Sequence, residues 1–125
     1  MELDILNHML DNEALNAQIN SRLYPSELPQ TPILPAVTYN TISKPRPIMG
    51  NQFYRIQYDV YANTYAQAKQ VAGLVEMAAM GSTVIDGLHT VYIDNHQDAY
   101  DSTKKRNHVI IDVIFYCLES TEFEQ

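Results

Sequence analysis

The stretch that decides the fold is residues 53–80, which spell FYRIQYDVYANTYAQAKQVAGLVEMAAM. Its first nine residues alternate between two sets of side chains, which is the pattern of a β-strand with one buried face. The expected buried face carries Tyr54, Ile56, Tyr58 and Val60, and the opposite face carries Arg55, Gln57 and Asp59. We therefore predict a strand over 53–61.

A helix is predicted to follow this strand, from Tyr65 to Met80. Thr64 precedes it and Gln67 lies three residues later, which is the spacing of a capping box. Apolar and mostly small residues recur along it at helical spacing, namely Ala68, Val71, Ala72, Val75 and Ala79. A narrow stripe of this kind allows close packing, so we expect the helix to cover the buried face of the strand.

Weaker patterns predict the other elements. An amphipathic helix is expected over 4–18, with Asp4 as its N-cap. The last two strands should form a hairpin joined by the polar residues 96–105. The predicted fold class is thus α+β, with a mainly antiparallel four-stranded sheet and two helices in a single domain over 1–125. The three further strands are expected over 36–42, 88–95 and 106–118.

The last predicted strand has two apolar faces. Ile110, Ile114 and Tyr116 alternate with a second apolar set that consists of Val109, Ile111, Val113 and Phe115. A sheet with helices on one side is expected to show a polar second face. Either this strand is central and covered on both faces, or its second face is buried against another subunit, and the pattern leaves both open.

All 6 prolines lie between positions 25 and 47, where they divide the chain into extended segments. The first segment is an arm that follows Tyr24 and lies over the fold's own surface or over a neighbour, with Leu28, Ile33 and Leu34 as apolar anchors. The second is a long loop over 44–51 that carries the apolar pair Ile48 and Met49. At the other end, residues 119–125 form an acidic tail that is expected to fray.

Charge and composition argue against several classes of protein. The chain has 125 residues, and 8 Lys and Arg against 15 Asp and Glu give a net charge of −7, which argues against a surface built to grip nucleic-acid phosphates. A single cysteine excludes an intramolecular disulfide and a thiolate metal cage. Without a signal peptide or an apolar run of about 18 residues, we expect a soluble protein of the reducing cytoplasm that makes no membrane contact.

Candidate chemical groups are few. Cys117 ends an apolar strand, which is typical of a small buried hydrophobic residue. One group of possible metal ligands lacks the glycine and glutamate of a calcium loop, so we interpret it as a polar turn: Asp94, His96, Asp98 and Asp101. We predict no enzyme, no cofactor and no bound metal. The basic cluster Lys104, Lys105 and Arg106 is either a solvated turn or a contact for an acidic partner or for DNA.

The order of four segments along the chain is informative. The first helix leads into Ile19-Asn20-Ser21-Arg22-Leu23-Tyr24-Pro25, and the arm leads into Leu34-Pro35-Ala36-Val37-Thr38-Tyr39. Arg55-Ile56-Gln57-Tyr58-Asp59-Val60-Tyr61-Ala62 and Thr64-Tyr65-Ala66-Gln67-Ala68 come next. Over nearly the whole chain, this order and spacing resembles the tail completion proteins of long-tailed bacteriophages, also called tail terminator or head–tail joining proteins. The closing strand, with Val109-Ile110-Ile111-Asp112, departs somewhat from that family.

The resemblance implies a structural virion protein at the tail–neck junction, assembled in the host cytoplasm. Six copies would form a ring that caps the tail tube and joins it to the head connector, with DNA passing through the lumen. An acidic lumen would not retain the phosphates. The expected contacts with neighbouring subunits or the tube involve Arg55, Gln57, Asp59, Ile48, Met49, Leu28, Ile33 and Leu34. Two alternatives stay open: another neck or connector subunit of the particle, and a monomeric, non-enzymatic binding module.

Overall fold

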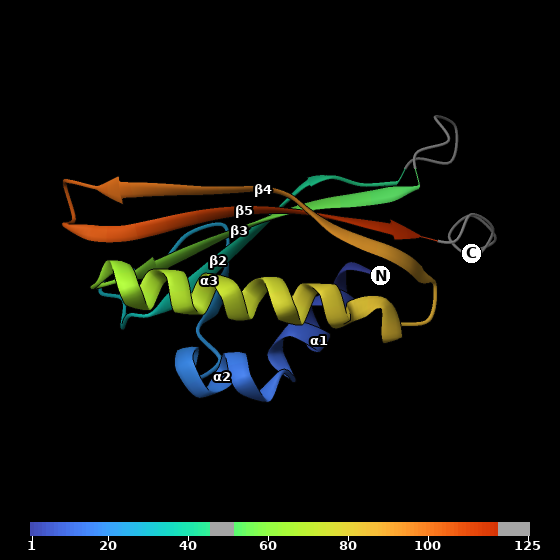
Figure 1. Cartoon of the computed structure of the whole chain (residues 1–125), viewed down its shortest axis with the longest axis horizontal. Coiled ribbons are helices and arrows are strands. Elements are labelled where there is room, and N and C mark those ends of the chain that lie inside the picture. Colours follow the sequence, from blue (N-terminus) through green and yellow to red (C-terminus); the bar gives the residue numbers. More distant parts are fainter. Residues whose placement is uncertain (46–51, 118–125) are drawn as a thin grey trace.

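A computed structural model describes residues 1–45 and 52–117, and it arranges them as one mixed sheet with its helices on one face (Figure 1). The sheet has five strands in the order β1-β2-β3-β5-β4. These are β1 (Leu23–Pro25), β2 (Ala36–Ser43), β3 (Phe53–Ala62), β4 (Leu88–Asp101) and β5 (Arg106–Cys117). The helices are α1 (Glu2–Leu10), α2 (Glu13–Ile19) and α3 (Tyr65–Met80), and the short 3-10 helix η1 (Gly81–Val84) follows α3.

The segment 53–80 folds as predicted. The side chains of β3 that were assigned to the buried face are at most 8% exposed, and the residues between them are half-buried. Before α3, the Thr64 hydroxyl accepts a hydrogen bond of 3.1 Å from the Gln67 amide. The small apolar stripe of α3 is fully buried against β3 and β5. This layer of helix on sheet is the centre of the core.

The N-terminal helix predicted over 4–18 is wrong in one respect, because it is two helices. Asn12 breaks it: its side chain accepts a hydrogen bond of 2.9 Å from the Leu15 amide and starts α2. The buried residues Ile5 and Met9 share one face of α1, and Leu15 and Ile19 share one face of α2. Met9 and Leu15 are six residues apart, which puts them on different faces of any single helix. The predicted cap, Asp4, lies inside the first turn of α1 instead.

The sheet has one strand more than predicted, and one strand is longer. β1 pairs in parallel with β2 at the edge of the sheet, where Pro25 can be accommodated although it has no amide hydrogen. β4 continues to Asp101, so the predicted loop over 96–105 is in fact strand up to a tight turn. A β-bulge between Ile93 and Asn95 interrupts the alternation of β4, which is why the sequence pattern seemed to stop there.

β5 is central in the sheet, between β3 and β4, and helices cover one of its two faces (Figure 1). The other face of the sheet, called the open face below, carries no helix within residues 1–45 and 52–117. Of the two alternatives left open by the sequence, the first is met only in part: the strand is central, but no helix covers its second face within the described residues. Within that described part, no helix is long and apolar enough to cross a membrane.

Tyr58 gives the core a testable pH dependence. Its ring lies in the core and is 2% exposed, and this burial raises the pKa of its phenol. The folded chain therefore keeps a proton that the unfolded chain releases near pH 10. The stabilisation is complete below that pH and is lost as the pH rises further. Between pH 8 and pH 11, we expect urea titrations to show a loss of unfolding free energy that is about 1 kcal/mol smaller for Tyr58→Phe than for the wild type. Equal losses would contradict this assignment.

Candidate assembly surfaces

The open face is built of cross-strand rows that alternate in character. The register of β3, β5 and β4 places Ile114 between Arg55 and Tyr92, and the next row along the strands is entirely polar. That polar row consists of Gln57, Asp112 and Asn95. The apolar residues of β5 on this face are thus separated by polar ones, so the open face is mixed rather than a continuous hydrophobic patch.

Arg55 is the centre of the polar network on this face. Its guanidinium lies 2.5 Å from the Asp94 carboxylate on β4 and 4.0 Å from the Asp112 carboxylate on β5. The Asp112 carboxylate also accepts hydrogen bonds of 3.1 Å from Gln57 and 3.4 Å from Asn95. Arg55 is 30% exposed and Asp112 is 16% exposed, so much of this network is shielded from water.

The third residue of the predicted face, Asp59, lies in a separate group. Its carboxylate accepts a hydrogen bond of 3.5 Å from Thr38 and lies 3.4 Å from His108 Nε2. The structure therefore places Arg55, Gln57 and Asp59 on one face, as predicted, but it divides them between two networks. In each network the partners lie on other strands, and the sequence alone does not show which residues of different strands are neighbours.

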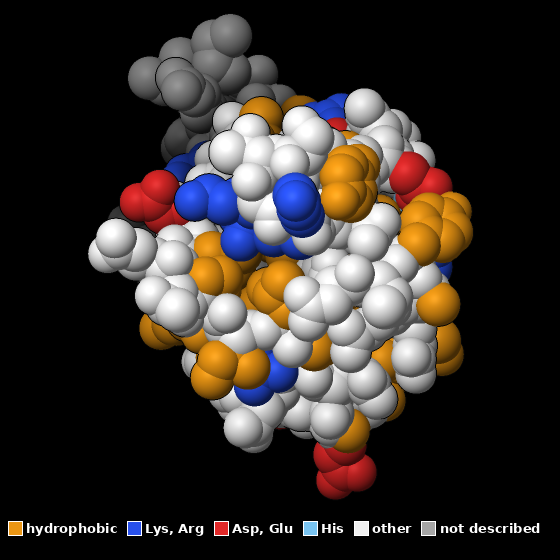
Figure 2. Space-filling view, turned by 90° about the vertical axis from the view of Figure 1, so that its left-hand side faces the viewer, with side chains coloured by type: hydrophobic (Ala, Val, Ile, Leu, Met, Phe, Trp, Pro, Cys, Tyr) orange, Lys and Arg blue, Asp and Glu red, His pale blue; other side chains and the backbone are white. Residues whose placement is uncertain are grey.

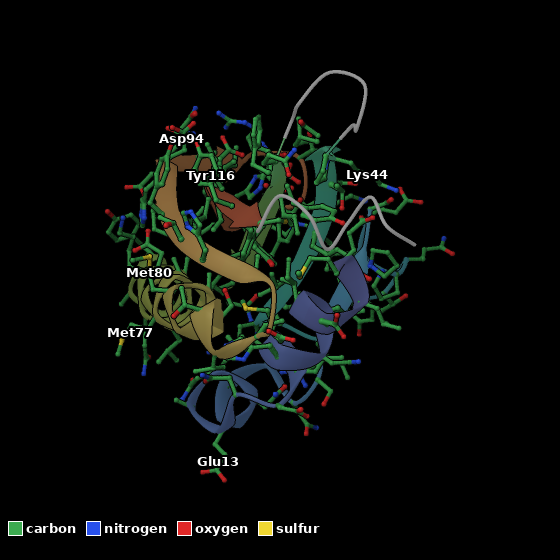
Figure 3. All side chains as sticks on the ribbon, turned by 90° about the vertical axis from the view of Figure 1, so that its right-hand side faces the viewer. Glu13, Lys44, Met77, Met80, Asp94 and Tyr116 are labelled. Atoms are coloured by element: carbon green, nitrogen blue, oxygen red, sulfur yellow. The ribbon has the colours of Figure 1, made fainter. Side chains whose placement is uncertain are left out.

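Three aromatic rings gather at the end of the open face where β3 begins. The Tyr116 ring lies 5.7 Å from Phe53 and 5.8 Å from Tyr92, measured between ring centres. Tyr92 is 39% exposed. Figure 3 shows Tyr116 and Asp94 in its upper part, whereas Met77 and Met80 lie lower, beside α3. Amphipathic rings of this kind are common at protein interfaces because they combine apolar area with a polar hydroxyl.

On the helix side of the sheet, β4 contributes a polar cluster that the sequence analysis missed. Asp98 accepts hydrogen bonds of 2.9 Å from both Lys69 and Tyr65 of α3. His96 Nδ1 lies 2.6 Å from the Glu76 carboxylate. The hydrogen bond from Lys69, followed by that from Tyr65, holds the pKa of Asp98 below its ordinary value, and the bond to Asp98 raises the pKa of Lys69. Both groups are therefore charged through the neutral pH range.

This cluster corrects the interpretation of the acidic residues near the hairpin. They belong to β4 rather than to a polar turn, and the bulge sends Asp94 to the open face while His96 and Asp98 face α3. Within the described residues, no group of three such side chains could hold a metal ion. Cys117 is buried at 4% exposure, as predicted for a small apolar residue.

The basic cluster lies at the tip of the β4–β5 hairpin. The Asp101 carboxylate accepts hydrogen bonds of 3.1 Å from the amides of Thr103 and Lys104, and these bonds close the turn. Arg106 begins β5, and its guanidinium carbon lies 4.8 Å from the centre of the Tyr61 ring. Figure 2 shows this end of the molecule, with Lys and Arg side chains above a hollow in which hydrophobic side chains are visible.

The proline-rich arm forms one wall of that hollow, which we call the arm recess. Its lining includes Leu28 and Leu34 of the arm together with Tyr61, Lys104 and Arg106. The arm is fixed at its far end, where Arg22 Nε donates a hydrogen bond of 3.0 Å to the Pro35 carbonyl. Leu28 and Leu34 are half-buried, whereas Ile33 is 67% exposed.

Ile48 and Met49, and the acidic tail over 119–125, fall outside the described residues. Lys44, at the start of the loop, makes an ion pair of 3.0 Å with Glu2 of α1.

Comparison with known proteins identifies the family. A family model described as "Tail completion protein gp17" matches residues 4–117, which is most of the chain. No curated protein sequence matches the chain. A solved structure titled "Virion of native gene transfer agent (GTA) particle" contains a chain of the same fold, with a TM-score of 0.73 and 14% identity over 94% of this chain and 93% of that one. The resemblance drawn from the order of the segments is thus confirmed: the chain belongs to the bacteriophage tail completion family represented by gp17.

Proposed function

We propose that this structural tail protein caps the tail tube as a ring of six and forms the head–tail joining interface, with DNA passing through its lumen. The observation that carries the proposal is the match of the tail completion family over residues 4–117. The fold shared with a chain of a virion particle is consistent with it. The proposed partners are further copies of the chain, the tail tube protein and the neck proteins of the head connector, and the proposed place is the tail–neck junction after assembly in the host cytoplasm.

The open face is our first candidate for contacts with subunits or with the tube. Arg55, Gln57 and Asp59 present polar groups there beside the partly exposed rings of Tyr92 and Tyr116. Hydrogen bonds and ion pairs with residues of β2, β4 and β5 hold these side chains in fixed positions, which reduces the entropy lost when a partner binds. The other proposed contact residues are Ile48 and Met49 of the loop and Leu28, Ile33 and Leu34 of the arm.

The charge of the chain suits a channel wall. At a net charge of −7, a ring of such subunits has little general attraction for DNA phosphates, because that attraction comes from Lys and Arg. DNA could then move through the lumen without being held. In such a ring the acidic side chains face the lumen, and DNA is a partner in transit only.

A charge reversal on the open face tests the proposal. In Arg55→Glu, the new carboxylate faces Asp94 and Asp112, so we expect the fraction of capped tails to fall at least about ten-fold. Tails assembled with purified chain are counted by negative-stain microscopy, and the variant's fold is verified by circular dichroism.

The control is Glu13→Lys, a charge reversal of the same size and opposite sign on α2, at the opposite end of the molecule from the open face in Figure 3. Equal capping by Arg55→Glu and the wild type would exclude the open face as an interface. Wild-type chain that binds heads but never tube ends would favour another neck subunit. Binding to neither would favour a monomeric binding module.

A further inference from the structure

The arm recess has the chemistry of a binding site for an acidic segment with an apolar anchor. It has a volume of about 460 Å³ and lies between the arm, the end of β3 and the hairpin tip. Leu28, Pro32 and Leu34 supply apolar surface, and Lys104 and Arg106 supply positive charge. Figure 2 shows this combination, with basic side chains above a hydrophobic hollow.

Neighbouring side chains hold the Arg106 guanidinium in place at the edge of the arm recess. This guanidinium stacks over Tyr61, and the Tyr61 ring in turn stacks on His108 at 4.4 Å between ring centres. Buried Arg106 Nε makes no hydrogen bond with the described residues, but it forms an ion pair of 3.6 Å with the Asp101 carboxylate, which helps to fix the guanidinium in place. A planar guanidinium fixed in this way matches a carboxylate, because its donors are already oriented.

The chain itself contains a segment of matching chemistry. Residues 118–125 read LESTEFEQ, in which Phe123 stands between Glu122 and Glu124. We propose that this segment of a second copy docks in the arm recess, with Phe123 against the apolar surface and the two glutamates at Lys104 and Arg106.

The docking is between copies because the segment cannot reach the recess of its own chain. β5 has 12 residues and runs from the hairpin tip to Cys117 at the opposite end of the sheet, so it spans roughly 36 Å (Figure 1). The chain from Cys117 to Phe123 spans at most about 22 Å when fully extended. Phe123 therefore falls short of its own recess by more than the width of a strand.

A contact of this kind joins one end of a subunit to the opposite end of the next. Such head-to-tail contacts are heterologous, and they generate closed rings when the rotation between subunits closes. The role of the contact in ring closure rests on the proposed function. The docking itself does not, because it needs only two copies of the chain.

Fluorescence anisotropy with a labelled peptide of residues 118–125 tests the docking on the purified full chain. We expect saturable binding that weakens as salt rises, because the contact pairs opposite charges. Lys104→Glu should weaken binding at least about ten-fold, as should Phe123→Ala in the peptide. Lys44→Glu, the same charge change on a cation paired with Glu2, should leave the affinity within about two-fold.

A second variant gives a gain of affinity. Glu27 also lines the recess, where its carboxylate repels the glutamates of the segment. Glu27→Gln should therefore strengthen peptide binding about two-fold or more. Because Glu27 is exposed in the arm, this change should not affect folding, which makes the result independent of any loss of stability.

Three results would overturn the docking: no saturable binding, equal binding of a scrambled peptide of the same composition, or no effect of Lys104→Glu. Peptide binding in the absence of tail capping would refute only the proposed function. Tail capping in the absence of peptide binding would refute only the docking.

Discussion

Replacing Val75 by aspartate is expected to unfold the protein. Val75 has no exposed surface and lies on the stripe of α3 that packs against β3 and β5. An unpaired carboxylate there costs several kcal/mol, whereas a domain of this size is stable by only about 5–15 kcal/mol. Thermal melts followed by circular dichroism should show a midpoint lowered by about 15 °C or more, or no cooperative transition at all.

The same helix offers a matched control. Met77 lies two residues further along α3 and is 73% exposed, so Met77→Asp introduces the same side chain into water (Figure 3). Its effect should stay within about 0.5 kcal/mol of the wild type. A Val75→Asp midpoint within about 2 °C of the wild type would mean that α3 does not belong to the core.

The parts of the fold that the sequence predicts best are those with an uninterrupted period. β3 and α3 each keep one pattern over their full length, and both are found at the predicted residues. The errors lie where a single residue shifts the periodic pattern of buried side chains. Asn12 restarts the N-terminal helix by capping α2, and the bulge at Asp94 shifts the alternation of β4. β1 was missed because three residues ending in proline carry no pattern at all.

The candidate surfaces show the same division. The alternation of β3 is enough to place Arg55, Gln57 and Asp59 on one face. Their partners depend on the register of β4 against β5, which a single sequence does not contain. The cluster of Lys69 with Asp98 was missed for this reason, since Asp98 faces the helix only after the bulge. The one signal in the sequence that could have indicated this orientation of Asp98 was the break in alternation after Ile93.

The arm recess joins segments that are far apart in sequence. Composition alone marks the arm and the basic cluster as unusual, but nothing in the sequence shows that Leu34 and Arg106 line the same hollow. Only the order of the strands brings the hairpin tip beside the arm, because β5 pairs antiparallel with β3 and begins near Tyr61, where β3 ends. Tertiary contacts of this kind combine the proline-rich arm and the basic cluster into one surface.

Assembly on the tail tube should differ sharply from behaviour in dilute solution. Six copies of a chain with net charge −7 together carry −42, which opposes ring closure at low salt. Salt screens this repulsion over a Debye length of about 8 Å near physiological ionic strength. We therefore expect the pure protein to be monomeric, or to form weak oligomers that increase with salt and protein concentration. Light scattering over a grid of both conditions measures this.

The tube end favours ring closure over the monomer, although the contacts between subunits stay the same. Copies bound side by side on one ring of tube subunits meet at an effective concentration that can reach about the millimolar range. Contacts too weak to persist in dilute solution are then occupied, and the last contact closes the ring without a further loss of translational freedom. Symmetry-resolved imaging of capped tails should show six copies at the capped end of each tube. A protein that stays monomeric on purified tubes, or never binds them, would contradict the ring, because the tube template and the contacts between subunits act together and neither alone would close it.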